Sequence, residues 1–354
     1  MNNKIYFLLL LSVTSCYNEK NKGFDSENIW EWGNIVEIKS LKSTIFLDEE
    51  EVFMPMDIEI YDDYLITLDE GGDDGCVQIF DLKTKKKVGE RISKGNGPLE
   101  MLTPQFVKGT KEYVTIWDMQ TSIIHKYRLK DFIDSASLKP FEIIKLNKRG
   151  YNNLSIVNDG FVSQLYDKKH QLCRYDTEGN RVSTFAEYPV HNNLDYNEII
   201  KRDAYYMNFI SNDTSSIALC YCMTDLIDIY DMNGRLKKRL HGPDYFIPHF
   251  EMIESNQVEG AYPIEDKCKD AFFSPKNYGD YFSVLYNGRS LNEENHNTEC
   301  DKIILFSWEG VPLICYQLDK RIISYAFDEE NKKIYAIAVD PEFMILEYDY
   351  QEQL

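Results

Sequence analysis

Short hydrophobic runs separated by polar breaks recur along the whole chain, and no long stretch shows the 3.6-residue spacing of an amphipathic helix. The runs are rich in β-branched and aromatic residues, while Gly, Asn, Asp and Lys occupy the breaks. This pattern is typical of short β-strands joined by turns. The sequence therefore predicts an almost entirely β protein.

Six of these runs form a repeat that is centred on an aromatic residue. The aromatic positions are Phe80, Tyr127, Tyr175, Tyr230, Phe306 and Tyr348. Their spacing is 42 to 55 residues with one longer gap of 76, the scale of a four-stranded propeller blade. In three copies a glycine follows four residues later, where a tight turn requires a positive φ.

A pair of strands with a polar turn precedes each aromatic run, as in MDIEIYDDYLITLD before the first copy. The last copy ends without a fourth strand, whereas residues 35–38 form a strand before the first copy. We predict that residues 35–38 complete the sixth blade, because closing the ring removes two free sheet edges. The predicted fold is an all-β, six-bladed β-propeller of four-stranded antiparallel blades, which spans residues 34–354 as one domain.

The fifth blade departs from the repeat, with an insertion near residues 244–268 before its inner strand. A second long loop, NGRSLNEENHNTECD, follows its second strand. In a propeller, inter-blade connections and the loops between strands two and three emerge on the same face, so both should overhang one mouth of the central channel. Long loops on a rigid scaffold commonly carry recognition.

The stretch KGNGPLEMLTPQF, which begins at Lys94, matches HGPDYFIPHF in the long insertion. Both copies follow a fourth strand, and both are predicted to be inter-blade connectors. By position alone, Asn96, Glu100, Tyr245 and His249 are candidates for the rim of a ligand site.

The first residues have the features of a lipoprotein signal. A lysine precedes an apolar run that is too short to span a bilayer but has the length of a signal-peptide core. The run ends in VTSC, which resembles the lipobox of bacterial lipoproteins. The resemblance implies that residues 1–15 are removed and that Cys16 carries the lipid anchor. The polar residues 16–33 are expected to form a flexible tether.

The formal net charge of -20 argues against nucleic acid as a partner, because phosphate binding requires clustered Lys and Arg. Together with the lipid anchor, it places the protein in the cell envelope, with the outer membrane as the expected membrane. Periplasmic and surface display both remain open.

Seven cysteines follow Cys16, and none of them has the C-x-x-C spacing of a zinc or redox site. Cys220 and Cys222 would lie on one face of a strand, which suits core packing. Cys268 and Cys300 are the pair that we would test for a disulfide.

Known catalytic patterns are missing from the sequence. Lys94 precedes the first glycine of its loop and Pro98 removes a backbone donor, so the stretch does not form a Walker phosphate loop. The acidic DEGGDDG cluster that begins at Asp69 lacks calcium-loop spacing and reads as a solvated turn. No H-E-x-x-H or G-x-S-x-G motif occurs. No catalytic, cofactor-binding or metal-binding residue is predicted, and no cofactor.

In its repeats and its N-terminal signal, the chain resembles the six-bladed β-propeller lipoproteins that are related to the TolB-like and NHL-like propellers. That group includes enzymes as well as pure binding modules, and the fold does not choose between them. We favour a non-catalytic module that binds a protein, peptide or glycan at the loop-rich mouth. The alternative is a metal-dependent hydrolase or lyase of the lactonase-like type, with a divalent metal near the axis.

Overall fold

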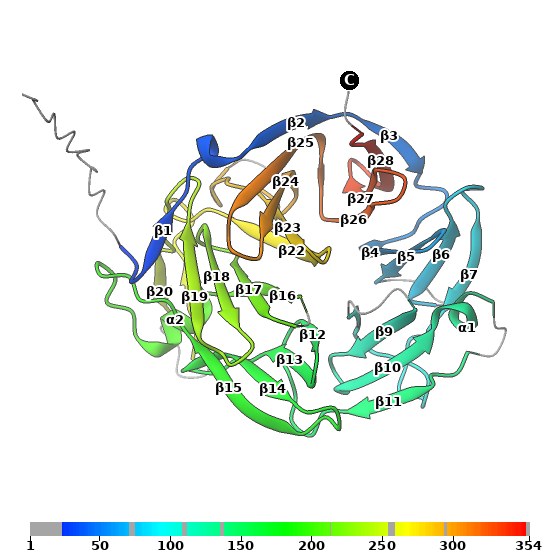
Figure 1. Ribbon diagram of the computed structural model, residues 1–354, viewed down its shortest axis with the longest axis horizontal. Coiled ribbons are helices and arrows are strands. Elements are labelled where there is room, and N and C mark those ends of the chain that lie inside the picture. Colours follow the sequence, from blue (N-terminus) through cyan, green and yellow to red (C-terminus); the bar gives the residue numbers. More distant parts are fainter. Residues whose placement is uncertain are drawn as a thin grey trace, which may run out of the picture.

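Six β-sheets are arranged as blades around a central axis in the computed structural model (Figure 1). The structure describes residues 23–70, 75–107, 112–134, 138–212, 214–253, 259–293 and 296–351. The six-bladed all-β propeller is confirmed. The predicted signal peptide and Cys16 lie outside the described residues.

The first three blades each contain four antiparallel strands. Blade one comprises β4 (Pro55–Tyr61), β5 (Tyr64–Asp69), β6 (Val77–Asp81) and β7 (Lys87–Arg91). Blade two comprises β8 (Pro104–Phe106), β9 (Tyr113–Asp118), β10 (Ile123–Arg128) and β11 (Glu142–Lys145), with α1 (Leu129–Asp134) before its last strand. Blade three comprises β12 (Leu154–Val157), β13 (Gly160–Gln164), β14 (His170–Tyr175) and β15 (Arg181–Glu187).

The other three blades recruit strands from the N-terminal segment. Blade four comprises β16 (Met207–Ser211), β17 (Ser216–Tyr221), β18 (Leu226–Asp231), β19 (Leu236–His241) and the added β1 (Glu27–Ile29). Blade five comprises β22 (Phe272–Asn277), β23 (Tyr281–Tyr286), β24 (Cys300–Ser307), β25 (Pro312–Ile322) and the added β2 (Glu37–Leu41). Blade six comprises β26 (Ser324–Asp328), β27 (Lys333–Val339), β28 (Phe343–Asp349) and β3 (Ser43–Leu47).

The repeated aromatic residues all lie on the third strand of their blades, and all six side chains are buried. They pack within the clusters that fill the space between neighbouring blades. Gly179, Gly234 and Gly310 have φ values of 85°, 79° and 72°, as the predicted turns require. The repeat therefore marks both the blades and their packing.

The strand that closes the ring is not the one predicted. β3 pairs antiparallel with β28 and completes blade six, whereas β2, which contains residues 37 and 38, pairs parallel with β25 of blade five. The physical reason is burial: Phe46 and Leu47 of β3 are buried between blades, while Ile38 of β2 is 57% exposed. The closing strand buries two adjacent apolar side chains at its end, whereas the outer fifth strand buries Leu41 alone.

The predicted tether is also wrong in its second half, because residues 23–33 pack on the propeller. β1 pairs parallel with the outer strand β19, and the 3-10 helix η1 (Trp32–Asn34) links it to β2. Phe24 is 1% exposed. We call residues 23–47 the N-terminal strap, which runs along the outer edges of blades four, five and six (Figure 1).

The two insertions of blade five meet on one face, as expected. The backbone N–H of Leu291 donates to the carbonyl of Cys268, and the backbone N–H of Asp270 donates to the carbonyl of Arg289. The first insertion contains the hairpin β20 (Phe250–Met252) and β21 (Ala261–Pro263). This hairpin packs against α2 (Glu198–Ala204) near the outer side of the ring (Figure 1). It does not overhang the channel mouth, which corrects the prediction.

All seven cysteines in the described part of the chain are free and buried. Cys220 and Cys222 are core residues, as predicted. Cys268 and Cys300 do not form the disulfide that we considered. Each thiol instead donates to a nearby backbone carbonyl, Cys268 to His249 and Cys300 to Thr298.

Candidate functional site

The inner strands surround a cavity of about 310 Å³ on the propeller axis, which we call the axial cavity. Its walls come from every blade, because the first strand of each blade faces the axis. The described lining residues are Met56, Asp57, Glu59, Phe106, Asn153, Leu154, Asn208, Phe209, Ile210, Phe273, Ser274, Pro275, Lys276, Ile323 and Ser324.

A buried ion cluster joins three of these strands. Lys276 Nζ of β22 donates to Asp57 Oδ1 and to Glu59 Oε1 of β4, each at 2.8 Å. Ser324 Oγ of β26 donates to the same Asp57 oxygen at 2.6 Å. A register shift in β22 between Phe273 and Lys276 marks a bulge next to the lysine. These contacts connect the inner strands of blades five, six and one, which follow one another around the axis.

The charge of Lys276 is held by its two partners. Burial alone lowers the pKa of Lys276, but Asp57 and Glu59 together raise it above its usual value. The lysine is therefore charged at neutral pH. A buried pair of this kind is sensitive to the loss of either partner.

A second cavity of about 490 Å³ adjoins the first, which we call the mouth cavity. The two share Met56, Asp57, Phe106 and Asn153. The remaining described lining residues belong to the second-to-third-strand loops of blades one and two, the connector between these blades, and the adjoining strand ends. They are Leu68, Asp69, Glu70, Cys76, Lys94, Leu102, Thr103, Pro104, Gln105 and Met119. The mouth cavity therefore lies at the loop-rich end of the channel.

Asp69 is a buried carboxylate of this cavity with one oxygen left without a partner among the described residues. Its side chain is only 3% exposed, and Thr67 Oγ1 donates to Oδ1 at 2.8 Å. Oδ2 has no hydrogen-bond partner among the described residues. Burial raises the pKa of Asp69 to about 6, although the bond from Thr67 and the charge of Lys87 oppose the rise. The predicted solvated turn is thus wrong for Asp69 itself, and residues 71–74 of the cluster lie outside the described residues.

The insertion forms a smaller pocket of about 260 Å³ away from the axis, which we call the hairpin pocket. Tyr151 and Tyr166 stack at 4.8 Å on one side, and Phe250 and Pro263 of the hairpin lie on the other. Arg202 stands 4.0 Å over the ring of Tyr166. Arg202 is also paired with Asp203, which accepts hydrogen bonds from Tyr166 and from the backbone of Ala261. This network fixes the hairpin on the blade.

The four predicted rim residues are not brought together. Asn96 and Glu100 are exposed on the connector between blades one and two, where Glu100 accepts a bond from the backbone of Gly97. Tyr245 and His249 lie on the connector between blades four and five. None of the four lines a cavity described above. Their contact with a ligand remains a prediction.

Tyr245 and His249 both have structural contacts. The hydroxyl of Tyr245 donates to the carbonyl of Trp30 at 2.6 Å, which ties the connector to the N-terminal strap. His249 exchanges backbone hydrogen bonds with the thiol of Cys268. Burial and nearby Lys267 lower the pKa of His249.

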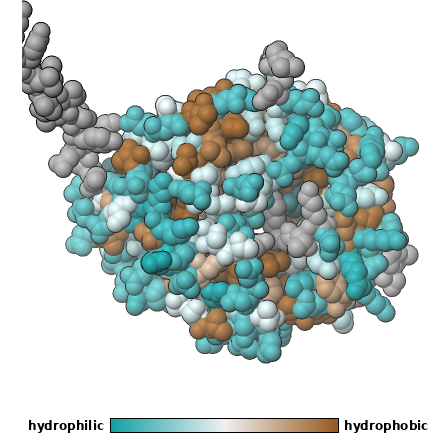
Figure 2. Space-filling view, viewed as in Figure 1, coloured by the Kyte–Doolittle hydropathy of each residue, from teal (hydrophilic) through white to brown (hydrophobic). Residues whose placement is uncertain are grey.

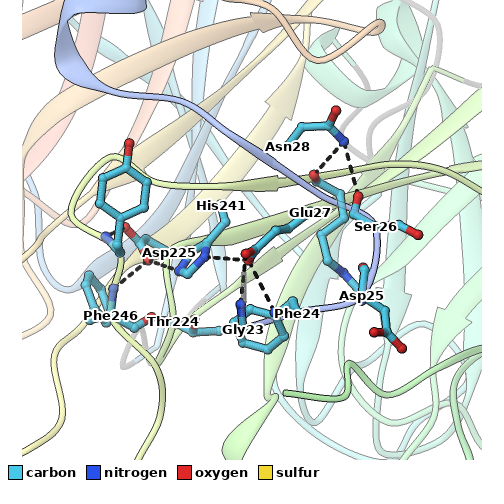
Figure 3. Close-up of polar contacts among 12 residues, drawn as sticks. Gly23, Phe24, Asp25, Ser26, Glu27, Asn28, Thr224, Asp225, His241 and Phe246 are labelled. Atoms are coloured by element: carbon cyan, nitrogen blue, oxygen red, sulfur yellow. Dashed lines mark hydrogen bonds and ion pairs between the residues drawn. The ribbon is translucent and has the colours of Figure 1, made fainter. Parts of the chain in front are cut away.

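A second buried charged cluster lies beneath the strap (Figure 3). His241 Nδ1 is 2.9 Å from Glu27 Oε2, and Nε2 is 3.3 Å from Asp225 Oδ1. Glu27 also accepts bonds from the backbone of Gly23 and Phe24. Burial lowers the pKa of His241, but Asp225 and Glu27 raise it more, so its pKa is above the usual value.

Sequence reasoning missed Asp57, Glu59 and Lys276 as a cluster. The available signal was the presence of charged residues inside inner-strand runs, in MDIEIY and FFSPKN. The exceptional environment of Asp69 was also missed. Its position at the end of a second strand is shared by Asp118 in TIWD, but the sequence does not show which carboxylate is left without donors.

Within the ranges that the structure describes, no three His, Cys, Asp or Glu side chains converge as a metal site would require. In the same ranges, no helix has the length and apolarity needed to cross a bilayer. The face seen in Figure 2 is mostly hydrophilic, with hydrophobic residues gathered in separate patches.

The fold and the axial cavities define a six-bladed propeller with a charged channel. Residues 34–330 match the family described as TolB-like 6-blade propeller-like, and the chain belongs to this family.

Solved structures agree on the fold. A member of the DUF4221 family from Bacteroides vulgatus ATCC 8482 matches with a TM-score of 0.55 at 10% identity, covering 87% of this chain and 96% of that one. A protein from Bacteroides fragilis NCTC 9343 matches with a TM-score of 0.53 at 11% identity, covering 89% and 100%. No protein of curated function matches the sequence significantly.

Proposed function

We propose that this chain is a lipid-anchored cell-envelope propeller that binds a protein, peptide or glycan ligand without catalysing a reaction. The proposed site is the mouth cavity at the loop-rich end of the channel. The observation that carries the proposal is the continuity of the mouth and axial cavities, which share four residues. Concave sites with apolar walls and a few polar groups are the usual form of a ligand site.

The composition of the mouth cavity supports binding. Met56, Leu68, Phe106 and Met119 supply apolar surface, and carboxylates and Thr103 supply acceptors. Leu68 and Phe106 lie on strands held by the blade hydrogen bonds, so this part of the lining needs little ordering when a ligand arrives. Most of the described lining of the mouth cavity comes from blades one and two, so the site is asymmetric about the channel axis.

A cavity-filling variant tests the proposal. Met56 lines both cavities and is 45% exposed, so Met56→Trp should fill the junction without removing a charged group. Val311 is equally exposed, lies in the turn between β24 and β25 of blade five and lines none of the cavities described above, so Val311→Trp is the matched control. Purified wild-type protein is screened on a peptide library and a glycan array, and the hits are measured with both variants.

We expect Met56→Trp to weaken each genuine hit at least about tenfold, while Val311→Trp binds as the wild type does. Tyr151→Ala provides the opposing test, because Tyr151 lines the hairpin pocket. Hits that survive Met56→Trp but are lost in Tyr151→Ala would move the site to that pocket. Hits that no variant affects would contradict a site in either place.

A further inference from the structure

Asp69 and Asp118 occupy equivalent positions, as the last residues of β5 and β9 in neighbouring blades. Asp118 accepts hydrogen bonds from the backbone N–H groups of Leu102, Thr103 and Gln120 at 3.0 to 3.2 Å. Asp69 accepts one bond, from Thr67, and its Oδ2 has no partner among the described residues. At the same place in the repeat, one carboxylate therefore accepts several hydrogen bonds and the other has an oxygen without a partner.

The connectors explain the difference. The connector into blade two passes over Asp118 and presents its amides to the carboxylate. The connector into blade one presents no backbone N–H to Asp69 among the described residues, although both connectors share the bond from the residue after the aspartate, Glu70 to Met54 and Met119 to Thr103. Asp69 is left buried at the wall of the mouth cavity. Buried polar groups normally have partners, so a missing partner in a cavity points to a ligand group.

The charges around the mouth cavity favour a cation. Asp57, Asp69 and Glu70 line it, and Lys94 is the single cation among its described lining residues. Asp57 is paired with Lys276, so Asp69 and Glu70 are the carboxylates that face Lys94. Farther out, Lys87 and Glu90 act on Asp69 with opposite signs. The described lining of the mouth cavity therefore carries more carboxylates than cations.

The walls beside Asp69 favour an alkyl chain. Leu68, Phe106 and Met119 line the same cavity, and Cys76 lies nearby as a buried thiol. A carboxylate below an apolar wall matches a group with a charged donor at the end of a hydrocarbon stem.

We propose that the mouth cavity binds the ammonium group of a lysine side chain or another alkyl primary amine, with Asp69 Oδ2 as its acceptor. This inference rests on the proposed function, since it names the chemistry recognised at the same site. The ammonium donates to Asp69, and the methylene stem packs on Leu68, Phe106 and Met119. A lysine-bearing peptide is the ligand class that follows.

The test uses Nα-acetyl-lysine N-methylamide as the probe and its Nε-acetyl derivative as the uncharged control. Binding is followed by calorimetry and by the carboxyl ¹³C shifts of the full mature chain. Asp69→Asn keeps the shape and removes the charge. Asp340→Asn is the matched control, because Asp340 follows the second strand of blade six and pairs with exposed Lys320.

We expect the probe to bind the wild type, Asp69→Asn to weaken it at least about tenfold, and Asp340→Asn to leave it unchanged. The Nε-acetyl derivative should not compete. Asp69→Asn should fold, because a neutral amide is easier to bury than a charge. Should it not fold, the wild-type spectrum decides alone, since probe binding must shift the Asp69 carboxyl signal.

Two results would overturn the inference: equal binding by Asp69→Asn, or equal binding of the acetylated probe. The proposed function fails separately. If library ligands depend on Met56 but not on Asp69, the binding site stands and the amine chemistry is wrong. If neither the probe nor any library ligand responds to Met56→Trp, both proposals fall.

Discussion

His241 Nδ1 lies 2.9 Å from Glu27 Oε2, so the last residue of the outer strand of blade four holds the N-terminal strap in place. On the other side of the imidazole, Asp225 Oδ1 lies 3.3 Å from Nε2. Asp225 also accepts three backbone hydrogen bonds from the connector between blades four and five. One imidazole therefore couples the strap to the start of the long insertion.

The first prediction concerns pH. The pKa of His241 is raised in the folded state, so protonation of His241 stabilises the fold. This contribution is complete below the unfolded-state pKa of about 6.5 and is lost as the pH rises through the higher folded value. Raising the pH from about 6 to about 9 should lower the unfolding midpoint, measured by thermal denaturation.

His241→Gln should flatten this dependence and cost about 3 kcal/mol at low pH, because it leaves two buried carboxylates without their cation. His170→Gln is the control, since His170 bonds to a hydroxyl, Thr184, rather than to a carboxylate. An unchanged pH profile in His241→Gln would show that other groups control the strap.

The second prediction concerns Lys276. Lys276→Met removes the cation between Asp57 and Glu59 and should lower the free energy of unfolding by about 3–5 kcal/mol. Lys320→Met breaks an exposed pair with Asp340 and should cost less than about 1 kcal/mol. Urea denaturation of both variants gives the comparison. Equal costs would mean that the axial cluster does not stabilise the ring.

The third prediction tests which strand closes the ring. Phe46 of β3 is 3% exposed, and Phe46→Ala should destabilise the protein by about 3–5 kcal/mol. Ile38 of β2 is 57% exposed, and Ile38→Ala should change the unfolding free energy by about 0.5 kcal/mol or less. The reverse order in urea denaturation would restore residues 35–38 as the closing strand.

The fourth prediction concerns the anchor. Cys16→Ser should abolish incorporation of a labelled fatty acid and release the protein from the membrane fraction, because a serine cannot accept the thioether-linked lipid. Cys76→Ser is the control, since Cys76 lies in the propeller. Membrane association that persists in Cys16→Ser would contradict the lipobox interpretation.

Much of the fold was predictable because a propeller repeats its packing. The aromatic of each third strand must fill the space between blades, so Phe80 and Tyr348 carry the same signal although they are far apart in sequence. The closing strand was not predictable in this way. β2 and β3 are adjacent five-residue strands, and only the tertiary context decides that Phe46 is buried and Ile38 is not.

The candidate site was less predictable than the fold. Connectors could be located from GP and PxF, but their path over Asp118 and away from Asp69 depends on backbone geometry. The pairing of Lys276 with Asp57 joins blades five and one, which are distant in sequence. A contact between residues so far apart in the chain cannot be predicted from a single sequence.

The N-terminal strap also determines how the propeller would respond to mechanical load. A pull on the chain at Gly23 reaches β1 first, then β2, and β3 only afterwards, because these strands follow one another along three blades. The outer two strands can detach while β3 still pairs with β28. Under tension, the strap would thus lose the outer strands β1 and β2 first, and the pairing that closes the ring would break only afterwards.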